Sequence, residues 1–117
     1  MSATLEEIRE RLHRARALRV AEAEPFVRAV RDRLPGAVAA LRARFAVGRV
    51  LLFGSFARGA PHPGSDVDIA VERLEASEQF RAMALMSREL RHPVDLVRLE
   101  DLAPADRERL LREAEPA

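Results

Sequence analysis

The chain has 117 residues, of which 48% are hydrophobic and 33% charged, and its formal net charge is +1. This size predicts one globular domain with a core of its own. The chain contains neither cysteine nor lysine, which excludes disulfides, thiolate metal sites, cysteine nucleophiles, Walker A loops and lysine Schiff bases. No apolar run approaches the length of a membrane span and no secretory signal is recognisable, so we expect a cytoplasmic protein without membrane contact.

The N-terminal third of the sequence predicts helices. Thr4 and Glu7 form a capping-box pattern, and apolar residues then recur at helical spacing over about residues 4–23. Pro25 is expected to break or restart this helix, because proline removes a backbone donor from a helix interior. A second apolar stripe ends before Pro35. The segment therefore forms either one kinked helix or two helices.

A glycine-rich loop follows the first predicted strand. A further helix over residues 38–45 leads into this strand, which is expected over residues 49–53. Gly54 and Ser55 then bring a small hydroxyl and unobstructed backbone N–H groups to the end of a buried strand, where a short helix over residues 56–59 could begin. Such an arrangement binds phosphate.

Two aspartates lie on the next predicted strand, over residues 66–72. Asp66 and Asp68 are two positions apart, so they project from the same face, about 6.6 Å apart at about 3.3 Å of rise per residue. Paired carboxylates at this spacing can bridge a divalent metal. The competing interpretation is an ordinary glycine turn between two strands, with the aspartates as solvated turn formers.

A third carboxylate lies on a later strand. A helix predicted over residues 75–91 precedes a short strand over residues 94–97, and a last helix is expected over residues 104–113. Asp95 alternates with apolar neighbours in this strand, so it points away from their face. Because neighbouring strands lie about 4.8 Å apart, this carboxylate is expected beside the first pair.

The motifs at residues 54–59, Gly-Ser-Phe-Ala-Arg-Gly, and at residues 65–68, Ser-Asp-Val-Asp, resemble the signature of the nucleotidyltransferase superfamily that includes DNA polymerase β. Within it, they resemble the minimal nucleotidyltransferases, which are antitoxin partners of HEPN toxins. The resemblance implies an α/β (α+β) nucleotidyltransferase fold, a small mixed β-sheet flanked by helices. Residues 35–117 would then form the minimal domain and residues 1–34 a helical N-terminal extension for partner contact. Ordinary core-covering helices are the alternative for the extension.

The resemblance also implies the roles of the site residues. The catalytic and metal-binding residues would be Asp66, Asp68 and Asp95, which would hold two Mg²⁺ ions. The nucleotide-binding residues would be Gly54, Ser55, Arg58 and Gly59. For Arg58, three roles remain open: it could contact phosphate, contact a carboxylate, or anchor the loop. The three histidines of the chain are interpreted as ordinary surface or loop residues.

The implied reaction is Mg²⁺-dependent transfer of AMP from ATP to a tyrosine of a cognate HEPN toxin, which makes the chain an antitoxin. The chain contains no tyrosine, which fits an acceptor on another molecule. One alternative is a non-catalytic antitoxin that binds the toxin. The other is an arginine-rich nucleic-acid-binding regulator, because residues 1–45 carry ten arginines and six acids. RNA binding is possible but not favoured, because aromatic residues make up only 4% of the chain.

Overall fold

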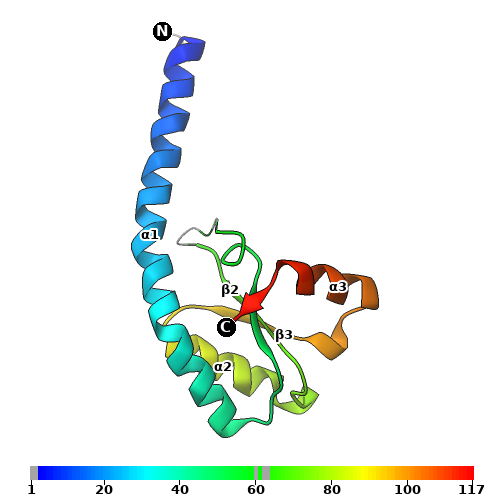
Figure 1. Cartoon of the computed structure of the whole chain (residues 1–117). Helices are drawn as coiled ribbons and strands as arrows, with labels where there is room; N and C mark the ends of the chain where they lie inside the picture. Colours follow the sequence, from blue (N-terminus) through cyan, green and yellow to red (C-terminus); the bar gives the residue numbers. More distant parts are fainter. Residues whose placement is uncertain (1–2, 60, 62–63) are drawn as a thin grey trace.

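The computed structural model describes residues 3–59, 61 and 64–117, leaving out the side chains of residues 16–24. Its helices are α1 (Leu5–Arg44), α2 (Gln79–Leu90) and α3 (Pro104–Glu113), with short 3₁₀ turns at Ala76–Glu78 and Leu99–Asp101. The strands are β1 (Val50–Phe53), β2 (Val67–Val71), β3 (Val94–Arg98) and β4 (Glu115–Pro116). They form one sheet in the order β3-β2-β1-β4 (Figure 1). Strands β2 and β3 are parallel, while β1 is antiparallel to β2 and β4, which confirms the predicted mixed α/β fold.

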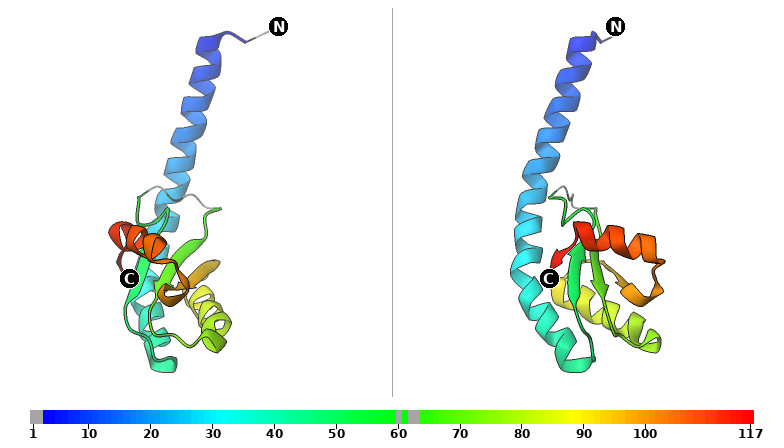
Figure 2. Two further views of the ribbon diagram at one scale, coloured as in Figure 1. Left: turned by 90° about the vertical axis from the view of Figure 1, so that its right-hand side faces the viewer. Right: turned by 45° about the vertical axis from the view of Figure 1, so that its right-hand side comes forward.

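Helices cover both faces of the sheet (Figure 2). Side chains alternate along each strand, so every strand contributes to two layers. Helices α1 and α2 cover the larger core, whose fully buried side chains include Leu41, Leu52, Ile69, Met86 and Leu96. The opposite face holds a smaller cluster around Leu51, Ala70 and Leu99, against which Leu110 and Leu111 of α3 pack. Along β2 and β3, Asp68 and Asp95 alternate with residues of the larger core. Their side chains therefore lie on the opposite face of the sheet, which α3 covers.

Helix α1 is continuous, with Pro25 and Pro35 inside it. Of the two alternatives left open, one helix or two, the structure has one, and the helix end predicted before Pro35 is wrong. The start of α1 was predicted correctly, because the Thr4 hydroxyl accepts a hydrogen bond of 3.2 Å from the Glu7 N–H. An interior proline costs a helix about 3 kcal/mol. Burial on both sides of Pro35 outweighs this cost, since each fully buried Val or Leu side chain contributes about 1.5–3 kcal/mol. The buried residues of this part of α1 are Val30, Leu34, Ala37, Val38 and Leu41.

The N-terminal part of α1 projects from the rest of the molecule (Figures 1 and 2). The whole molecule, with this part included, measures 61 × 30 × 21 Å. Leu5, Ile8 and Leu12 on this part are 64%, 43% and 63% exposed. The division into residues 1–34 and 35–117 stays a prediction; its boundary falls inside α1, after residues that already belong to the core. In the described part of the chain, no helix has the length and apolar composition that crossing a membrane requires.

The loop after β1 is a series of turns, so the short helix predicted over residues 56–59 is wrong. The Arg58 N–H donates to the Gly54 carbonyl at 3.1 Å, and the Gly59 N–H donates to the Phe56 carbonyl at 3.2 Å. Gly54 and Gly59 have φ angles of +70° and +72°, outside the range of a right-handed helix. The two ends of the loop therefore leave the helical region, and only isolated helix-like hydrogen bonds remain.

Candidate functional site

Three carboxylates meet at the end of the sheet where β1 ends and β2 begins. Asp68 on β2 and Asp95 on β3 are direct register partners in the parallel pair. Asp66 stands just before β2. The burial pattern agrees with the alternation predicted for β3, because Asp95 is exposed between buried Val94 and Leu96. The structure therefore brings the three predicted acids to one end of the sheet.

The other two carboxylates lie close enough to Asp68 to affect its ionisation. Partial burial raises the pKa of Asp68 above its ordinary value of 3.8, and the negative charges of Asp95 and then Asp66 raise this pKa further. The guanidinium of Arg58 acts in the opposite direction and lowers it. Like charges held at this proximity repel one another. The site therefore concentrates negative charge, and the Arg58 guanidinium counteracts this charge at Asp68.

Gly54 lies directly against the Asp68 carboxylate. Phe53 is the register partner of Asp68 in the β1–β2 pair, so the turn that starts at Gly54 begins beside this aspartate. A Cβ atom placed on Gly54 would overlap an Asp68 carboxylate oxygen and would stand 3.0 Å from the Asp68 Cγ atom. Glycine is needed here for two reasons, its positive φ and the absence of a side chain.

Phe56 anchors the turn to α1, and Arg31 of α1 links this contact to β4. The Phe56 side chain is buried, and its ring packs edge-on against Phe26 of α1 with centroids 5.5 Å apart. Arg31 of α1 donates a hydrogen bond of 3.3 Å to the Phe56 carbonyl and forms an ion pair of 2.8 Å with Glu115 of β4. These contacts hold the turn in place without using the groups that face the carboxylates.

His92 stabilises the other side of the site, a role that its surroundings in the sequence do not indicate. Its Nε2 atom lies 2.6 Å from the Ser65 carbonyl oxygen, and since a carbonyl can only accept, Nε2 carries the hydrogen. The imidazole also packs against Phe26, with ring centroids 4.4 Å apart. His92 thus lies in the loop between α2 and β3, as the surface-or-loop interpretation expected, but it is half-buried there and fixes the backbone directly before Asp66.

The remaining predicted residues lie on the turn. Arg58 forms an ion pair of 3.6 Å with Glu113 of α3, which joins the turn to this helix, and its charge lowers the pKa of Asp68. This ion pair fits two of its three predicted roles, contact with a carboxylate and anchoring of the loop. Both partners are well exposed, and such pairs contribute about 0–1 kcal/mol. Ser55 is half-buried, and a Cβ atom placed on Gly59 would meet nothing within 4 Å.

The donor set fits Mg²⁺. Carboxylate oxygens are the ligands that this ion prefers. A divalent cation would relieve the repulsion that, after partial burial, raises the pKa of Asp68. Across the described residues, no three potential ligand side chains converge into a ready-made cage. Mg²⁺ usually binds through one or two carboxylates together with substrate phosphates and water. The residues therefore fit an ion that arrives with a nucleotide.

The family model for polymerase beta nucleotidyltransferases matches residues 38–115. The chain belongs to this family. The match includes the glycine turn, all three aspartates and His92, and it begins within the anchored part of α1. No curated protein matches the chain.

Solved structures place the chain among minimal nucleotidyltransferases. One minimal nucleotidyltransferase is 31% identical, with a TM-score of 0.69 over 78% of this chain and 95% of that chain. A toxin-antitoxin crystal structure with AMP-PNP is 24% identical, with a TM-score of 0.61 over 69% of each chain. A tri-AMPylated HEPN toxin of Shewanella oneidensis in complex with MNT antitoxin gives 17% identity and a TM-score of 0.53, over 77% of this chain and 70% of that chain. The last two likenesses concern the fold alone.

Proposed function

We propose that this nucleotidyltransferase transfers AMP from ATP to a tyrosine hydroxyl of a HEPN toxin in a Mg²⁺-dependent reaction, and thereby acts as an antitoxin. The observation that carries the proposal is the pairing of Asp68 with Asp95 on parallel strands, next to the turn at Gly54. Family membership supports nucleotidyl transfer. The similar fold of toxin-antitoxin structures supports the class of partner.

In the proposed reaction, the tyrosine oxygen attacks the α-phosphorus of ATP, the bond from this phosphorus to the bridging oxygen breaks, and pyrophosphate leaves. Mg²⁺ held by Asp66, Asp68 and Asp95 would supply charge neutralisation at the phosphates. Asp95 accepts the hydroxyl proton as the new phosphoester bond forms. Its position suits this role, because β3 is an edge strand and Asp95 is exposed on it.

The turn would hold the triphosphate. Its backbone N–H groups near Gly54 and the Ser55 hydroxyl can donate to phosphate oxygens, and the two glycines leave the backbone unobstructed. Arg58 can exchange its exposed partner Glu113 for a phosphate, since their 3.6 Å ion pair is of the weak, solvent-screened kind. Arg58 would then carry positive charge toward the leaving pyrophosphate.

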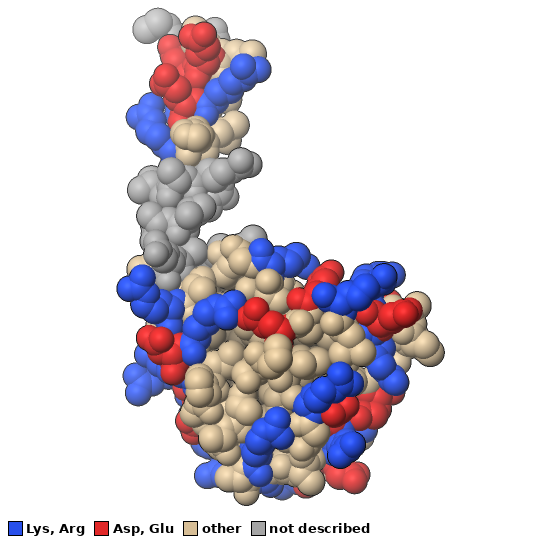
Figure 3. Space-filling view, viewed as in Figure 1, with Lys and Arg blue, Asp and Glu red and all other residues tan. Residues whose placement is uncertain are grey.

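The partner would have to supply the acceptor, because the chain has no tyrosine of its own. The projecting part of α1 offers a docking surface, with an apolar stripe of Leu5, Ile8 and Leu12 that is largely exposed. This stripe suits a helical protein better than a nucleic acid. On the face seen in Figure 3, basic and acidic side chains are interspersed, whereas nucleic-acid binding favours a continuous basic surface.

The test is co-expression with a HEPN protein encoded beside this chain, followed by intact-mass analysis of both proteins with and without ATP and Mg²⁺. We expect an added adenylyl group on the HEPN protein, mapped to a tyrosine, and no addition with Asp95→Asn. Arg109→Gln on the surface of α3 serves as the control variant and should leave transfer unchanged. Adenylylation of a small molecule or an RNA end, with the HEPN protein unmodified, would refute the antitoxin role but not nucleotidyl transfer.

A further inference from the structure

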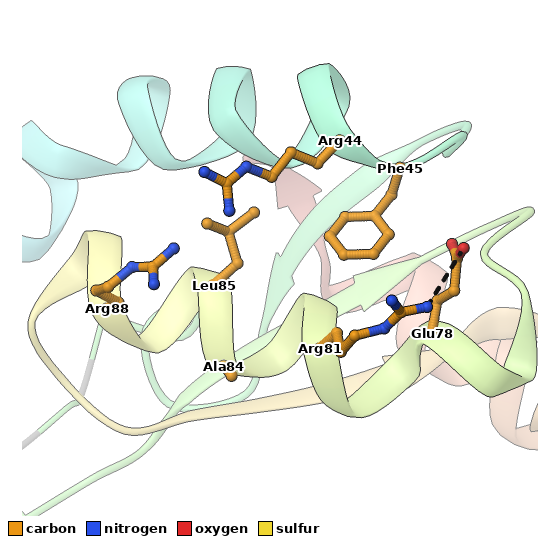
Figure 4. Close-up of a pocket in the computed structure, with 7 residues that line it drawn as sticks. All are labelled: Arg44, Phe45, Glu78, Arg81, Ala84, Leu85 and Arg88. Atoms are coloured by element: carbon orange, nitrogen blue, oxygen red, sulfur yellow. Dashed lines mark ion pairs between the residues drawn. The ribbon is translucent and has the colours of Figure 1, made fainter.

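A hollow lies between the C-terminal end of α1 and helix α2 (Figure 4), with a volume of about 410 Å³. It is separate from the carboxylates. Phe45 at its rim precedes β1, whereas Gly54 follows this strand, so the two places lie at opposite ends of the sheet. We refer to this hollow as the arginine groove. The residues that line it are Arg44, Phe45, Glu78, Arg81, Ala84, Leu85 and Arg88.

The arginine groove carries excess positive charge. Of its three arginines, Arg81 pairs with Glu78 at 3.7 Å, an exposed contact within one helical turn. Arg44 and Arg88 form no ion pair with any residue in the described ranges. Figure 4 shows their side chains reaching toward Leu85 from the two helices. Guanidinium groups gathered around one hollow with a single carboxylate favour an anionic ligand.

The floor of the groove is apolar, which narrows the class of ligand. Leu85 is 4% exposed and belongs to the main core, Phe45 is packed against that core, and Ala84 leaves an open position beside them. A free phosphate would use the arginines and leave this floor uncovered. A peptide with acidic and apolar side chains can use both, because carboxylates match guanidinium groups in pairs while an apolar residue covers the floor.

We infer that the arginine groove binds an acidic, amphipathic segment of a protein partner. A nucleic acid is the less suitable occupant, because stacking in the groove would depend on Phe45 alone and acidic side chains are interspersed with basic ones on the visible face of the molecule. The inference is independent of the proposed transfer reaction, since the groove shares no residue with the glycine turn or the carboxylates. It gives the domain a second recognition surface away from its active site.

The experiment measures fluorescence anisotropy of a labelled peptide of glutamate and leucine residues with the full chain. The double variant Arg44→Gln/Arg88→Gln should weaken binding by at least about tenfold, since it removes two charge-assisted contacts. The matched control Arg109→Gln/Arg112→Gln changes the net charge equally on exposed positions of α3 and should bind like wild type. Ala84→Glu, at an exposed position, should abolish binding by placing a carboxylate among the arginines.

Three results would overturn the inference. Absence of binding by the wild-type chain would show that the groove does not accept acidic peptides. Equal weakening in both double variants would reduce the effect to general charge attraction. Tighter binding of a single-stranded oligonucleotide, with the same loss in Arg44→Gln/Arg88→Gln, would assign the groove to nucleic acid. Circular dichroism of each variant separates these outcomes from loss of folding.

Discussion

Gly54 and Gly59 provide a test of whether the glycine turn serves the site or only closes a loop. Both residues have a left-handed φ, +70° and +72°, so replacing either by alanine should cost about 1–2 kcal/mol of folding free energy. They differ in what a Cβ atom would meet. At Gly54 it would overlap the Asp68 carboxylate, whereas at Gly59 nothing lies within 4 Å.

The expected results therefore diverge. Gly54→Ala should displace the Asp68 carboxylate and reduce kcat/KM for nucleotidyl transfer by about 10–100-fold, the range seen when support of a metal ligand is lost. Gly59→Ala should lose only the stability that the left-handed φ costs in urea unfolding, less than Gly54→Ala loses, and should retain most of its activity. In an Asp68→Ala background the overlap is absent, so the additional stability cost of Gly54→Ala should fall to that of Gly59→Ala. Equal activity of the two glycine variants would refute the argument that Gly54 exists to make room for Asp68.

Three further predictions concern the surroundings of the site. Because the pKa of Asp68 is raised in the folded state, its charge destabilises the protein above that pKa and not below the ordinary value of 3.8. Asp68→Asn should then have a higher free energy of unfolding than wild type at neutral pH, should lose this gain in acid, and should abolish transfer. An equal gain over wild type at both pH values in urea titrations would contradict the prediction. His92→Ala should lower kcat more than it raises KM and cost about 0.5–1.5 kcal/mol, and His92→Gln, which can still donate to Ser65, should recover part of the activity. Arg31→Ala removes the hydrogen bond to the Phe56 carbonyl and should raise the KM for ATP, measured by steady-state kinetics against Arg109→Ala as control.

Local patterns account for the parts of the fold that were predicted. The strands containing Asp68 and Asp95 follow from alternation of apolar and polar residues, and their adjacency follows from a helix connecting two parallel strands. Helix α3 was predicted with its observed bounds, because Pro104 marks the first turn and the apolar pair near its end marks a packed face. These features depend on neighbours within a few residues, which sequence patterns record.

Long-range packing accounts for what was missed. The sequence indicates that Pro35 disfavours a helix at this position. It does not show that buried residues on both sides of Pro35 stabilise the continuous helix. The contact between His92 and Ser65 spans 27 positions, and the one between Arg31 and Phe56 spans 25. Strand β4 has two residues and contains Pro116, so neither length nor composition identifies it. Each of these misses involves a residue whose role depends on a partner distant in sequence, whereas the missing helix over residues 56–59 follows from the φ angles of Gly54 and Gly59.

Phe26 connects the candidate site with the projecting part of α1. Among the described side chains it is the first along the helix that packs against the main core, and it contacts both Phe56 of the turn and His92, which holds the backbone before Asp66. Most of the stability of a helix in a protein comes from tertiary packing, so the projecting segment depends on this anchored part for its helical form. Packed interiors transmit small displacements because they contain few voids. A partner that binds Leu5, Ile8 and Leu12 therefore acts on the same helix whose Phe26 ring touches both flanks of the carboxylate site.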